Sequence, residues 1–387
     1  MKKIFIFLLI ISLLPLYTFD FDVKANENLI PNATNGILIE PTTKTIIYEK
    51  GIDEEVSIAS LTKMMGLILI FEKLQSGDIK YTDKVTASKN ASDMGGSQIW
   101  LSPGEVMTVE ELLKGIIMAS ANDGIVAMAE YIGGTESNFV KMMNDKAKEL
   151  GLKHTNFVNP TGLDEDGHYS SAYDVAMIAI ELMKYPDVFK FTTVYEGYLR
   201  ENTENKFWLV NTNKLIATYN GADGLKTGMT DDAGYCMAVT AKRNGMRLLA
   251  VVLGEKQGKV RNSETASLLD YGFNTYEVDS IKVKGDKVGE ISLDKANPDK
   301  IDVIVNEDVN ALKRKGEEAK EYKSEVKLNN ISLPLKKGEI IGKLLVKDNN
   351  EIIKEIDLVS NQDMFRKSFL NIFLNILKSV FTGELIS

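Results

Sequence analysis

The chain has 387 residues, of which 44% are hydrophobic and 26% charged, so it is long enough for two domains and for a full core. The net charge of −9, without a basic block away from the termini, excludes a nucleic-acid partner. A single cysteine excludes an intramolecular disulfide, and with only two histidines we expect neither a metal site nor a cofactor.

Residues 1–25 have the pattern of an export signal. Two lysines precede an apolar run from Ile4 to about Leu14, and Val23-Lys24-Ala25 places small side chains where a signal peptidase cuts. The alternative is a membrane-spanning anchor that is not cleaved, but the apolar run is shorter than the roughly 20 residues that a membrane helix needs, and Pro15 interrupts it. We therefore expect cleavage after Ala25 and export to the outer face of the cytoplasmic membrane.

Residues 36–50 predict two short strands around a turn, and a buried helix follows. Ser57 is its expected N-cap and Gly77 its expected C-terminal stop. The run from Met64 to Phe71 is almost wholly apolar, which indicates that the helix lies in the core.

This helix places a hydroxyl and an amine together near its start. Ser60 and Lys63 are three residues apart, so on a helix their Cβ atoms lie roughly 5–6 Å from each other. Burial lowers the pKa of a lysine, and a neutral amine can take the proton of a serine hydroxyl. Ser60 is therefore a candidate nucleophile and Lys63 its base. The spacing alone is weak evidence, because Ser324 and Lys327 repeat it in a charged segment that we interpret as solvated surface.

A mainly helical region follows. Residues 85–100 predict a loop, and a capping box from Thr108 to Glu111 predicts the start of the next helix. Ser120 and Asn122 fall in a tight break between two of the expected helices, which cover residues 108–118, 123–132, 137–150 and 172–184.

Beyond residue 190 the pattern changes to period two. It predicts strands with a clear hairpin at Asn244-Gly245, and a helix from Arg261 to Tyr271 follows. Cys236, in one of these strands, is interpreted as a buried small side chain. The strands cover residues 192–195, 207–210, 224–227, 236–242 and 246–254. Strands at both ends with helices between them predict an α+β domain, with helices packed on an antiparallel sheet, over residues 26–278.

The remaining chain predicts a small β-sandwich and an amphipathic tail. Short alternating strands with turn signals fill residues 279–360, where no catalytic constellation occurs. Within residues 361–387, the stretch from Met364 to Phe381 carries Phe and Ile on one helical face and Lys367 and Lys378 on another. We expect this helix to lie in a membrane surface, apolar face down; docking onto the sandwich is the alternative.

Three short motifs share a pattern described for penicillin-binding proteins and class A β-lactamases: Ser60-Leu61-Thr62-Lys63, Ser120-Ala121-Asn122 and Lys226-Thr227-Gly228. Acyl transfer needs a nucleophile, a route for its proton to the leaving amine, and donors for the oxyanion. Ser60, Lys63 and Ser120 supply the first two.

The other motif residues suit substrate binding. Lys226 offers positive charge to a substrate carboxylate, and Thr227 offers a hydroxyl donor. Gly228 allows a substrate backbone to approach closely, and Asn122 can bond both a substrate amide and a lysine. No histidine is required, and we expect His154 and His168 at the surface.

Beyond the motifs, the sequence resembles the serine-type D-alanyl-D-alanine carboxypeptidases, which are low-molecular-mass penicillin-binding proteins. The resemblance spans nearly the whole mature chain, most clearly at residues 94–105, 151–176, 223–243 and 334–344. It implies removal of the terminal D-alanine from peptidoglycan stem pentapeptides through an acyl-enzyme, with β-lactams acylating the same serine. By position it implies Ser60 as nucleophile, Lys63 as proton acceptor, Ser120 as proton relay, Lys226 as substrate-binding residue, and the backbone N–H groups of Ser60 and Met229 as oxyanion hole.

Some positions depart from the family, and other activities stay open. Some relatives have histidine in place of Met229 and arginine in place of Thr212, so we expect Lys226 to carry more of the carboxylate contact. A class A β-lactamase is disfavoured, because residues 159–171 lack the Glu-x-x-x-Asn segment that positions a deacylating water. A D,D-endopeptidase or transpeptidase, and a non-catalytic cell-wall binding protein, are the remaining alternatives.

Overall fold

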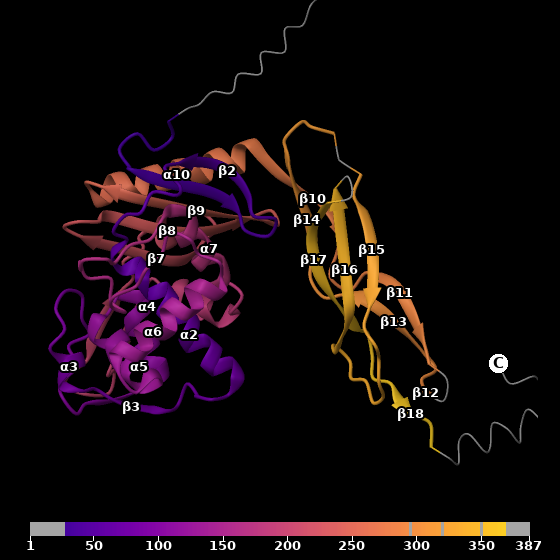
Figure 1. Ribbon diagram of the computed structural model, residues 1–387, viewed down its shortest axis with the longest axis horizontal. Coiled ribbons are helices and arrows are strands. Elements are labelled where there is room, and N and C mark those ends of the chain that lie inside the picture. The colour runs from indigo at the N-terminus through magenta and orange to yellow at the C-terminus, as the bar shows by residue number, and fades with distance from the viewer. Residues whose placement is uncertain (1–27, 294–295, 319–320, 349–350, 369–387) are drawn as a thin grey trace, which may run out of the picture.

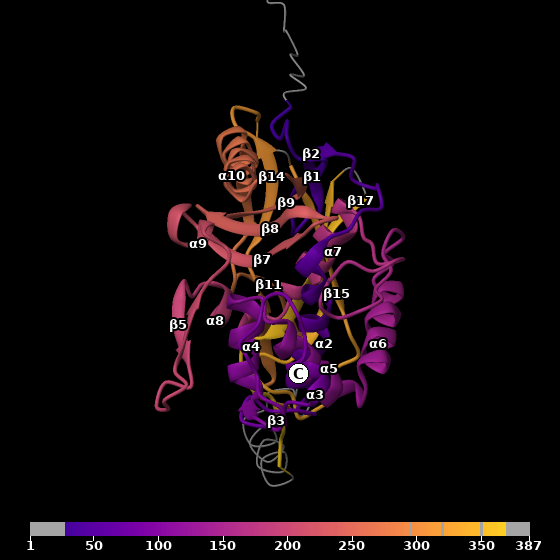
Figure 2. The same ribbon diagram turned by 90° about the vertical axis from the view of Figure 1, so that its left-hand side faces the viewer.

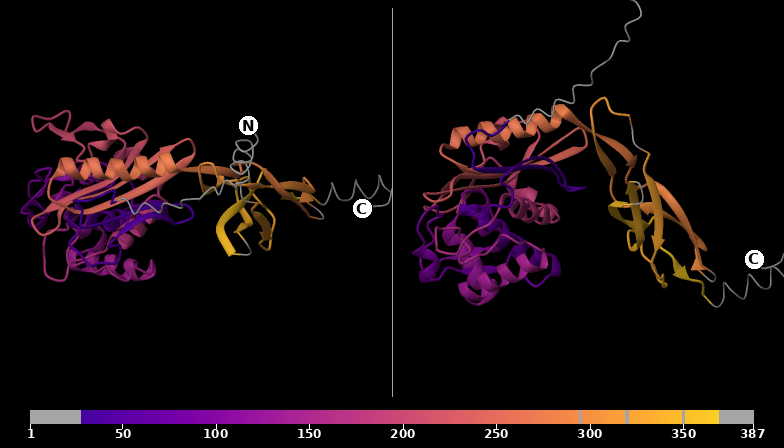
Figure 3. Two further views of the ribbon diagram at one scale, coloured as in Figure 1. Left: turned by 90° about the horizontal axis from the view of Figure 1, so that it is seen from above. Right: turned by 45° about the horizontal axis from the view of Figure 1, so that its top comes forward.

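The computed structural model describes residues 28–293, 296–318, 321–348 and 351–368, so the predicted export signal lies outside the described residues. A domain of helices and strands is followed by a domain built of strands (Figure 1). They meet where α10 (Gly258–Thr275) runs directly into β10 (Tyr276–Lys282), and they lie side by side (Figure 3). This arrangement confirms the predicted fold class.

A five-stranded antiparallel sheet, in the order β2-β1-β9-β8-β7, organises the first domain. Its strands are β1 (Asn35–Glu40), β2 (Thr45–Lys50), β7 (Ala222–Thr230), β8 (Gly234–Arg243) and β9 (Met246–Glu255). Asn244 and Gly245 join β8 to β9 with positive φ angles of 48° and 81°, as the predicted tight hairpin requires. Within the described part of the chain β7 pairs with β8 alone, so its other edge is open.

Both faces of this sheet are covered, which explains why β8 and β9 are apolar on both sides. Ile37 and Val251 pack toward the helices on one face, and Leu248 and Ala250 pack toward α10 on the other. Figure 2 shows α10 on one side of the sheet and the larger group of helices on the opposite side. The two cores hold β7, and hence one wall of the site, in a fixed position.

The larger helical layer contains α2 (Lys63–Ser76), α4 (Val109–Met118), α5 (Asn122–Gly133), α6 (Glu136–Glu149) and α7 (Ala172–Leu182). The predicted capping box is confirmed: Thr108 Oγ1 accepts from the Glu111 amide (3.1 Å), and the Glu111 carboxylate accepts from the Thr108 amide (2.9 Å). Helix α2 ends as predicted at Gly77, whose φ is 80°. Shorter elements connect these helices to the sheet: β3 (Lys84–Thr86), α3 (Lys89–Ser92), β4 (Val106–Thr108), η2 (Pro186–Val188), α8 (Phe189–Thr192), β5 (Glu196–Leu199), β6 (Phe207–Val210) and α9 (Leu215–Thr218).

Three local predictions are wrong. Ser57 does not cap a helix, because a 3-10 turn, η1 (Ala59–Thr62), precedes α2 and begins after Ile58 without a side-chain cap. The predicted loop at residues 85–100 contains α3, which is capped by Ser88 Oγ. The predicted strand at residues 192–195 is instead the end of α8 and the turn after it. Each error is local, because short segments take the conformation that their tertiary contacts impose.

The second domain is all β. Its five-stranded sheet, in the order β11-β13-β17-β16-β15, shares one core with the pair β10-β14. The strands are β11 (Lys287–Ser292), β12 (Ala296–Asn297), β13 (Lys300–Val305), β14 (Val309–Arg314), β15 (Lys323–Leu328), β16 (Ile340–Asp348), β17 (Glu351–Ser360) and β18 (Phe365–Arg366). Ser324 and Lys327 lie exposed on β15, which agrees with their interpretation as solvated surface.

The predicted C-terminal helix does not begin at Met364. Met364 is buried, and it exchanges two backbone hydrogen bonds with Leu335 (2.8 and 2.9 Å). Phe365–Arg366 then pairs with Ala296–Asn297. These residues are strand because Met364 completes the core of the β domain. The stretch from residue 369 onward lies outside the described residues, and none of the described helices is both long and apolar enough to cross a membrane.

Candidate active site

The three motifs meet between the helical layer and the open edge of the sheet. Ser60 lies in η1 and Lys63 begins α2, while Ser120 lies in the break between α4 and α5. Lys226 lies on β7, which packs against η1. Ala59 and Ser120 hold positive φ angles of 49° and 62° although neither is glycine. Such backbone strain costs about 1–3 kcal/mol per residue and persists where surrounding contacts fix the chain, often at functional sites.

Lys63 is the centre of the hydrogen bonds. Its Nζ is buried and donates to Ser60 Oγ (2.8 Å), to Asn122 Oδ1 (2.6 Å) and to the backbone oxygen of Thr161 (2.6 Å). The Asn122 amide group is oriented by its other end, because its Nδ2 donates to the backbone oxygen of Gly95 (2.7 Å). The structure therefore brings Ser60, Lys63 and Asn122 into direct contact.

These three hydrogen-bond partners determine where the lone pair of Lys63 points when its amine is neutral. A neutral amine has two N–H groups and one lone pair, and the oxygens of Asn122 and Thr161 can only accept hydrogen bonds. Both N–H groups are thus used on these oxygens. The lone pair then faces the Ser60 hydroxyl, which is the one partner with a proton to give.

Both site lysines have lowered pKa values. Burial lowers the pKa of Lys63 well below its usual value, and the positive charge of Lys226 adds to this, while Asp123 opposes it. Burial, followed by the charge of Arg261, lowers the pKa of Lys226 to about 7. The lowered pKa favours the neutral, proton-accepting form of Lys63, which suits it to act as a base.

Ser120 contacts the second lysine. Lys226 Nζ donates to Ser120 Oγ (2.8 Å) and to the backbone oxygen of Thr227 (2.8 Å). Because Ser120 Oγ accepts from Lys226, its own hydroxyl hydrogen can point elsewhere in the site. Thr227 Oγ1 donates to Thr212 Oγ1 (2.7 Å), so the position that bears arginine in some relatives lies directly beside Thr227.

Gly228 and Met229 complete this wall. A Cβ atom at Gly228 would lie 2.9 Å from the Ser60 backbone nitrogen and 2.9 Å from Ala59 Cβ. Glycine is therefore needed here so that η1 can pack closely against β7. The sequence predicts the approach of a substrate backbone at Gly228, whereas the contact in the structure is with η1. Met229, the next residue, is 55% exposed at the mouth of the site.

Sequence reasoning missed the loop that supplies the Thr161 carbonyl. Asn159 Oδ1 accepts from the Thr161 amide (3.2 Å), from its hydroxyl (2.8 Å) and from the Gly162 amide (2.8 Å), which folds the loop tightly. Gly162 has a φ of 78°, and a Cβ there would lie 1.9 Å from the Ala59 oxygen. The Asn-Pro-Thr-Gly run was a turn signal, although nothing in it marks a backbone oxygen as a lysine partner.

The predicted surface position of His168 is wrong. Its Nδ1 accepts from the Val158 amide (3.2 Å), so its Nε2 carries the hydrogen and donates to Thr62 Oγ1 (2.8 Å). Burial lowers its pKa to about 4. Through these two hydrogen bonds the neutral His168 ties the loop to Thr62 at the start of α2. Its ring packs edge-on against Phe157 rather than facing solvent.

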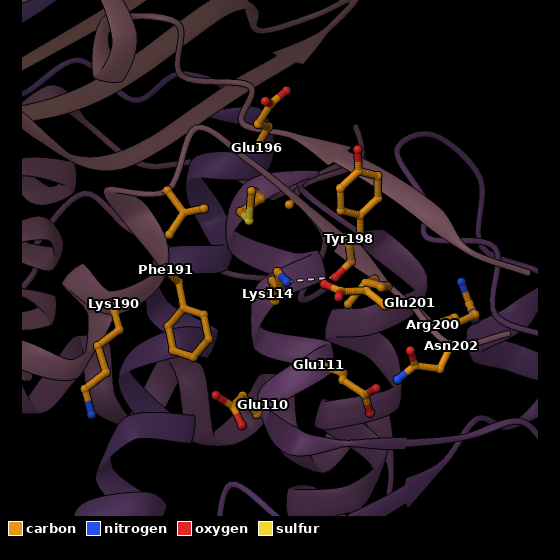
Figure 4. A pocket seen from close by; sticks show the side chains of 14 residues that line it. Glu110, Glu111, Lys114, Lys190, Phe191, Glu196, Tyr198, Arg200, Glu201 and Asn202 are labelled. Atoms are coloured by element: carbon orange, nitrogen blue, oxygen red, sulfur yellow. Dashed lines mark hydrogen bonds between the residues drawn. The ribbon is translucent and has the colours of Figure 1, made fainter.

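A separate pocket between α4, α8 and β5 contains none of the predicted site residues (Figure 4). Lys114 crosses it and donates to the backbone oxygen of Tyr198 (2.7 Å). In the described part of the chain, no group of three or more His, Cys, Asp or Glu side chains is placed to hold a metal ion.

Comparison with known families agrees with this geometry. The family model of the D-alanyl-D-alanine carboxypeptidases, peptidase family S11, matches residues 22–257. The model of the penicillin-binding protein 5 C-terminal domain matches residues 276–366.

Individual relatives match most of the chain. D-alanyl-D-alanine carboxypeptidase DacF of Bacillus subtilis is 47% identical, covering 90% of this chain and 90% of its own. The structure of penicillin-binding protein 5 from Haemophilus influenzae is 30% identical with a TM-score of 0.66, covering 87% of this chain and 98% of its own. Penicillin-binding protein D2 from Listeria monocytogenes in its ampicillin-bound form is 29% identical with a TM-score of 0.57, covering 62% of this chain and 98% of its own. The chain therefore belongs to the serine-type D-alanyl-D-alanine carboxypeptidases, the enzymes that its motifs indicated.

Proposed function

We propose that Ser60 is the nucleophile of this carboxypeptidase and Lys63 its general base. The observation that carries the proposal is the set of contacts around Lys63, whose two pure acceptors leave its lone pair to the Ser60 hydroxyl. The lowered pKa of Lys63 supports the same roles.

The reaction proceeds in two steps. Lys63 takes the hydroxyl proton while Ser60 Oγ attacks the carbonyl carbon of the terminal amide, and the backbone N–H groups of Ser60 and Met229 stabilise the oxyanion. Ser120 gives its hydroxyl proton to the leaving nitrogen and regains one from the Lys63 ammonium group. The C–N bond breaks and D-alanine leaves, after which water hydrolyses the acyl-enzyme by the reverse proton path.

The substrates we propose are peptidoglycan stem pentapeptides, with β-lactams as acylating inhibitors. Lys226 and Thr227 bind the terminal carboxylate, Gly228 lets η1 approach β7, and Asn122 holds the substrate amide as well as Lys63. The ampicillin-bound relative supports β-lactam binding at this kind of site.

We also propose a division of the chain by role. Residues 1–25 are a cleaved export signal and residues 26–278 the catalytic domain. The β domain runs from residue 279 to residue 366, beyond the expected end at residue 360, because Met364 completes its core and Phe365–Arg366 is its last strand. The residues after the strand at Phe365–Arg366 attach the enzyme to the outer face of the cytoplasmic membrane. Deleting the residues after Ser368, which keeps Met364 and the strand Phe365–Arg366 in place, should abolish binding to anionic vesicles, and unchanged binding would reject the attachment.

Intact mass spectrometry with penicillin tests the nucleophile. We expect one adduct, mapped to Ser60, and release of D-alanine from a stem pentapeptide. Ser60→Ala should lose both, whereas Ser324→Ala, at the exposed copy of the same spacing, should keep both. Cleavage or formation of cross-links in place of D-alanine release would favour an endopeptidase or transpeptidase, and an adduct on another residue would contradict the mechanism.

A further inference from the structure

Both tryptophans of the chain are exposed, and both lie on the catalytic domain. Trp100, in the segment before β4, is 69% exposed, and Trp208, on β6, is 57% exposed. Tyr198 on β5 pairs directly with Trp208 and is 40% exposed, so these two rings share one face of the β5–β6 hairpin. Tryptophan is highly buried on average, so a group of exposed rings of this kind indicates a binding surface.

Arg200 joins the two segments that carry these rings. It lies two residues after Tyr198, and its Nη1 donates to the backbone oxygen of Ile99 (3.0 Å), the residue before Trp100. Its Nε donates to Glu105 Oε1 (2.6 Å), in the same segment as Trp100. Figure 2 shows the hairpin standing out from the rest of the domain next to α8. We refer to the three rings together as the aromatic surface: Trp100, Tyr198 and Trp208.

The backbone on both sides of Trp100 is held in place. The buried Asp123 carboxylate accepts from the Ile99 amide (3.1 Å) and from the Leu101 amide (3.0 Å). Between them Trp100 has a positive φ of 58°, a conformation that bulky residues rarely adopt. Such strain persists where surrounding contacts impose it, commonly at binding sites. The fold thus fixes the position of a residue whose ring is exposed.

The hairpin holds its two rings clear of the domain. Figure 4 shows the Tyr198 ring pointing away from Lys114, whose Nζ donates to the Tyr198 backbone oxygen (2.7 Å). Lys206 Nζ lies 3.9 Å from the centroid of the Tyr198 ring and steadies it through a cation–π contact. The larger Trp208 ring beside it is therefore the main stacking platform of the hairpin.

Both segments also reach the candidate active site. The backbone oxygen of Ser97, in the first segment, accepts from the Asn122 amide (2.7 Å). Four residues after Trp208, Thr212 Oγ1 accepts from Thr227 Oγ1 (2.7 Å). In the proposed binding mode Thr227 holds the terminal carboxylate of a stem peptide, so the aromatic surface extends the site beyond that terminus. It therefore faces the polymer that surrounds a bound stem peptide rather than the strand that carries this peptide.

The size and charge of the aromatic surface favour one kind of partner. The three rings present at most about 400 Å², half of the roughly 800 Å² that each partner of a stable protein complex buries. At the hairpin tip the exposed Glu201 and Glu204 outnumber Lys206, so an anionic lipid surface is repelled. Asn202 and Asn205, exposed at the same tip, offer amide donors and acceptors. Flat rings flanked by amides suit sugars, which have apolar C–H faces and hydroxyl edges.

We propose that the aromatic surface binds sugar rings of a neighbouring glycan strand of peptidoglycan. The C–H faces of the sugars stack on the Trp100 and Trp208 rings, and their hydroxyl groups bond to Asn202 and Asn205. The enzyme is thereby held on the polymer while stem peptides enter and leave the site. This binding needs no acylation, so the inference goes beyond the proposed function and rests on it only for the identity of the polymer.

The fluorescence of Trp100 and Trp208 reports on this surface directly, because the chain has no other tryptophan. Titration of the full-length enzyme with a β-1,4-linked N-acetylglucosamine hexamer should give a saturable shift of the emission to shorter wavelength, since stacking removes the rings from water. Trp208→Ala should weaken the affinity roughly three- to tenfold, as expected for the loss of one aromatic contact. Tyr131→Ala is the matched control, because it removes a ring that is also 40% exposed, from α5, and should leave the affinity unchanged.

Turnover gives a second readout. In Trp208→Ala, kcat/KM for D-alanine release from intact peptidoglycan should fall roughly three- to tenfold, whereas kcat/KM for a soluble stem pentapeptide should not change. An unchanged spectrum with the hexamer, an equal affinity in Trp208→Ala, or a spectral shift with phosphatidylglycerol vesicles and not with the hexamer would overturn the inference. Failure of the proposed function gives a different result, because Ser60 would then form no penicillin adduct while the hexamer still bound.

Discussion

Replacing Gly228 with alanine should impair acylation without unfolding the enzyme. The added Cβ would lie 2.9 Å from the Ser60 nitrogen, 2.9 Å from Ala59 Cβ and 3.1 Å from the Ile58 oxygen. Carbon contacts are most favourable at about 3.5–4.0 Å, so η1 must move away from β7 by roughly 0.5–1 Å. The positions of the Ser60 amide and hydroxyl would shift with it.

A displacement of about 1 Å in a catalytic group costs on the order of 10²-fold in rate. We therefore expect the second-order rate of penicillin acylation to fall about 10²-fold in Gly228→Ala, measured by intact mass spectrometry over time. Overpacking should lower the free energy of unfolding by about 1–3 kcal/mol, which urea titration measures.

Gly289→Ala is the matched control, because Gly289 also lies on a strand but a Cβ there would meet Val303 at an ordinary 3.8 Å. Its acylation rate should equal that of the wild type. A folded Gly228→Ala enzyme that acylates at the wild-type rate would refute the argument that η1 and β7 fix the nucleophile.

Two further predictions concern pH. Because the pKa of Lys226 is about 7, its ammonium form is lost above that pH, so kcat/KM for a carboxylate-bearing peptide should decline from pH 7 to 9. Lys226→Arg keeps its charge and should flatten this decline; a decline of the same size in the variant would contradict the assignment. His168 has a folded pKa of about 4, below its usual 6.5, so the unfolded chain takes up the proton first and stability should fall by about 3 kcal/mol between pH 6.5 and 4. Urea unfolding should show that His168→Gln removes this loss, whereas replacing the partly exposed His154 should leave it in place.

Local signals were sufficient for much of the fold. The Asn244-Gly245 pair needs two positive φ angles, which few other residue pairs accept, and it fixes the hairpin between β8 and β9. The capping box at Thr108 works through hydrogen bonds within four residues, so it is fully encoded in the local sequence. The motif serines and lysines were recognisable because their chemistry belongs to their side chains.

The missed features depend on contacts between distant segments. The 3-10 turn at Ser60 forms where Gly162 and Gly228 press against Ala59 from two sides, which no local pattern encodes. The Thr161 carbonyl is a backbone group, so residue identity does not reveal that it orients Lys63. His168 is buried through Thr62 and Val158, although its sequence neighbours are polar.

Burial of Lys63 and Lys226 lowers the free energy of unfolding of the catalytic domain. An unfolded lysine keeps its proton in water, and the folded chain must either hold that charge without solvent or release the proton. Substituting Lys63 or Lys226 with an apolar residue of similar length should therefore give an inactive protein that withstands heat better than the wild type. Heat resistance and antibiotic sensitivity would then change in opposite directions. A screen that selects only for thermal stability would therefore favour variants that have lost one of these lysines and, with it, the activity.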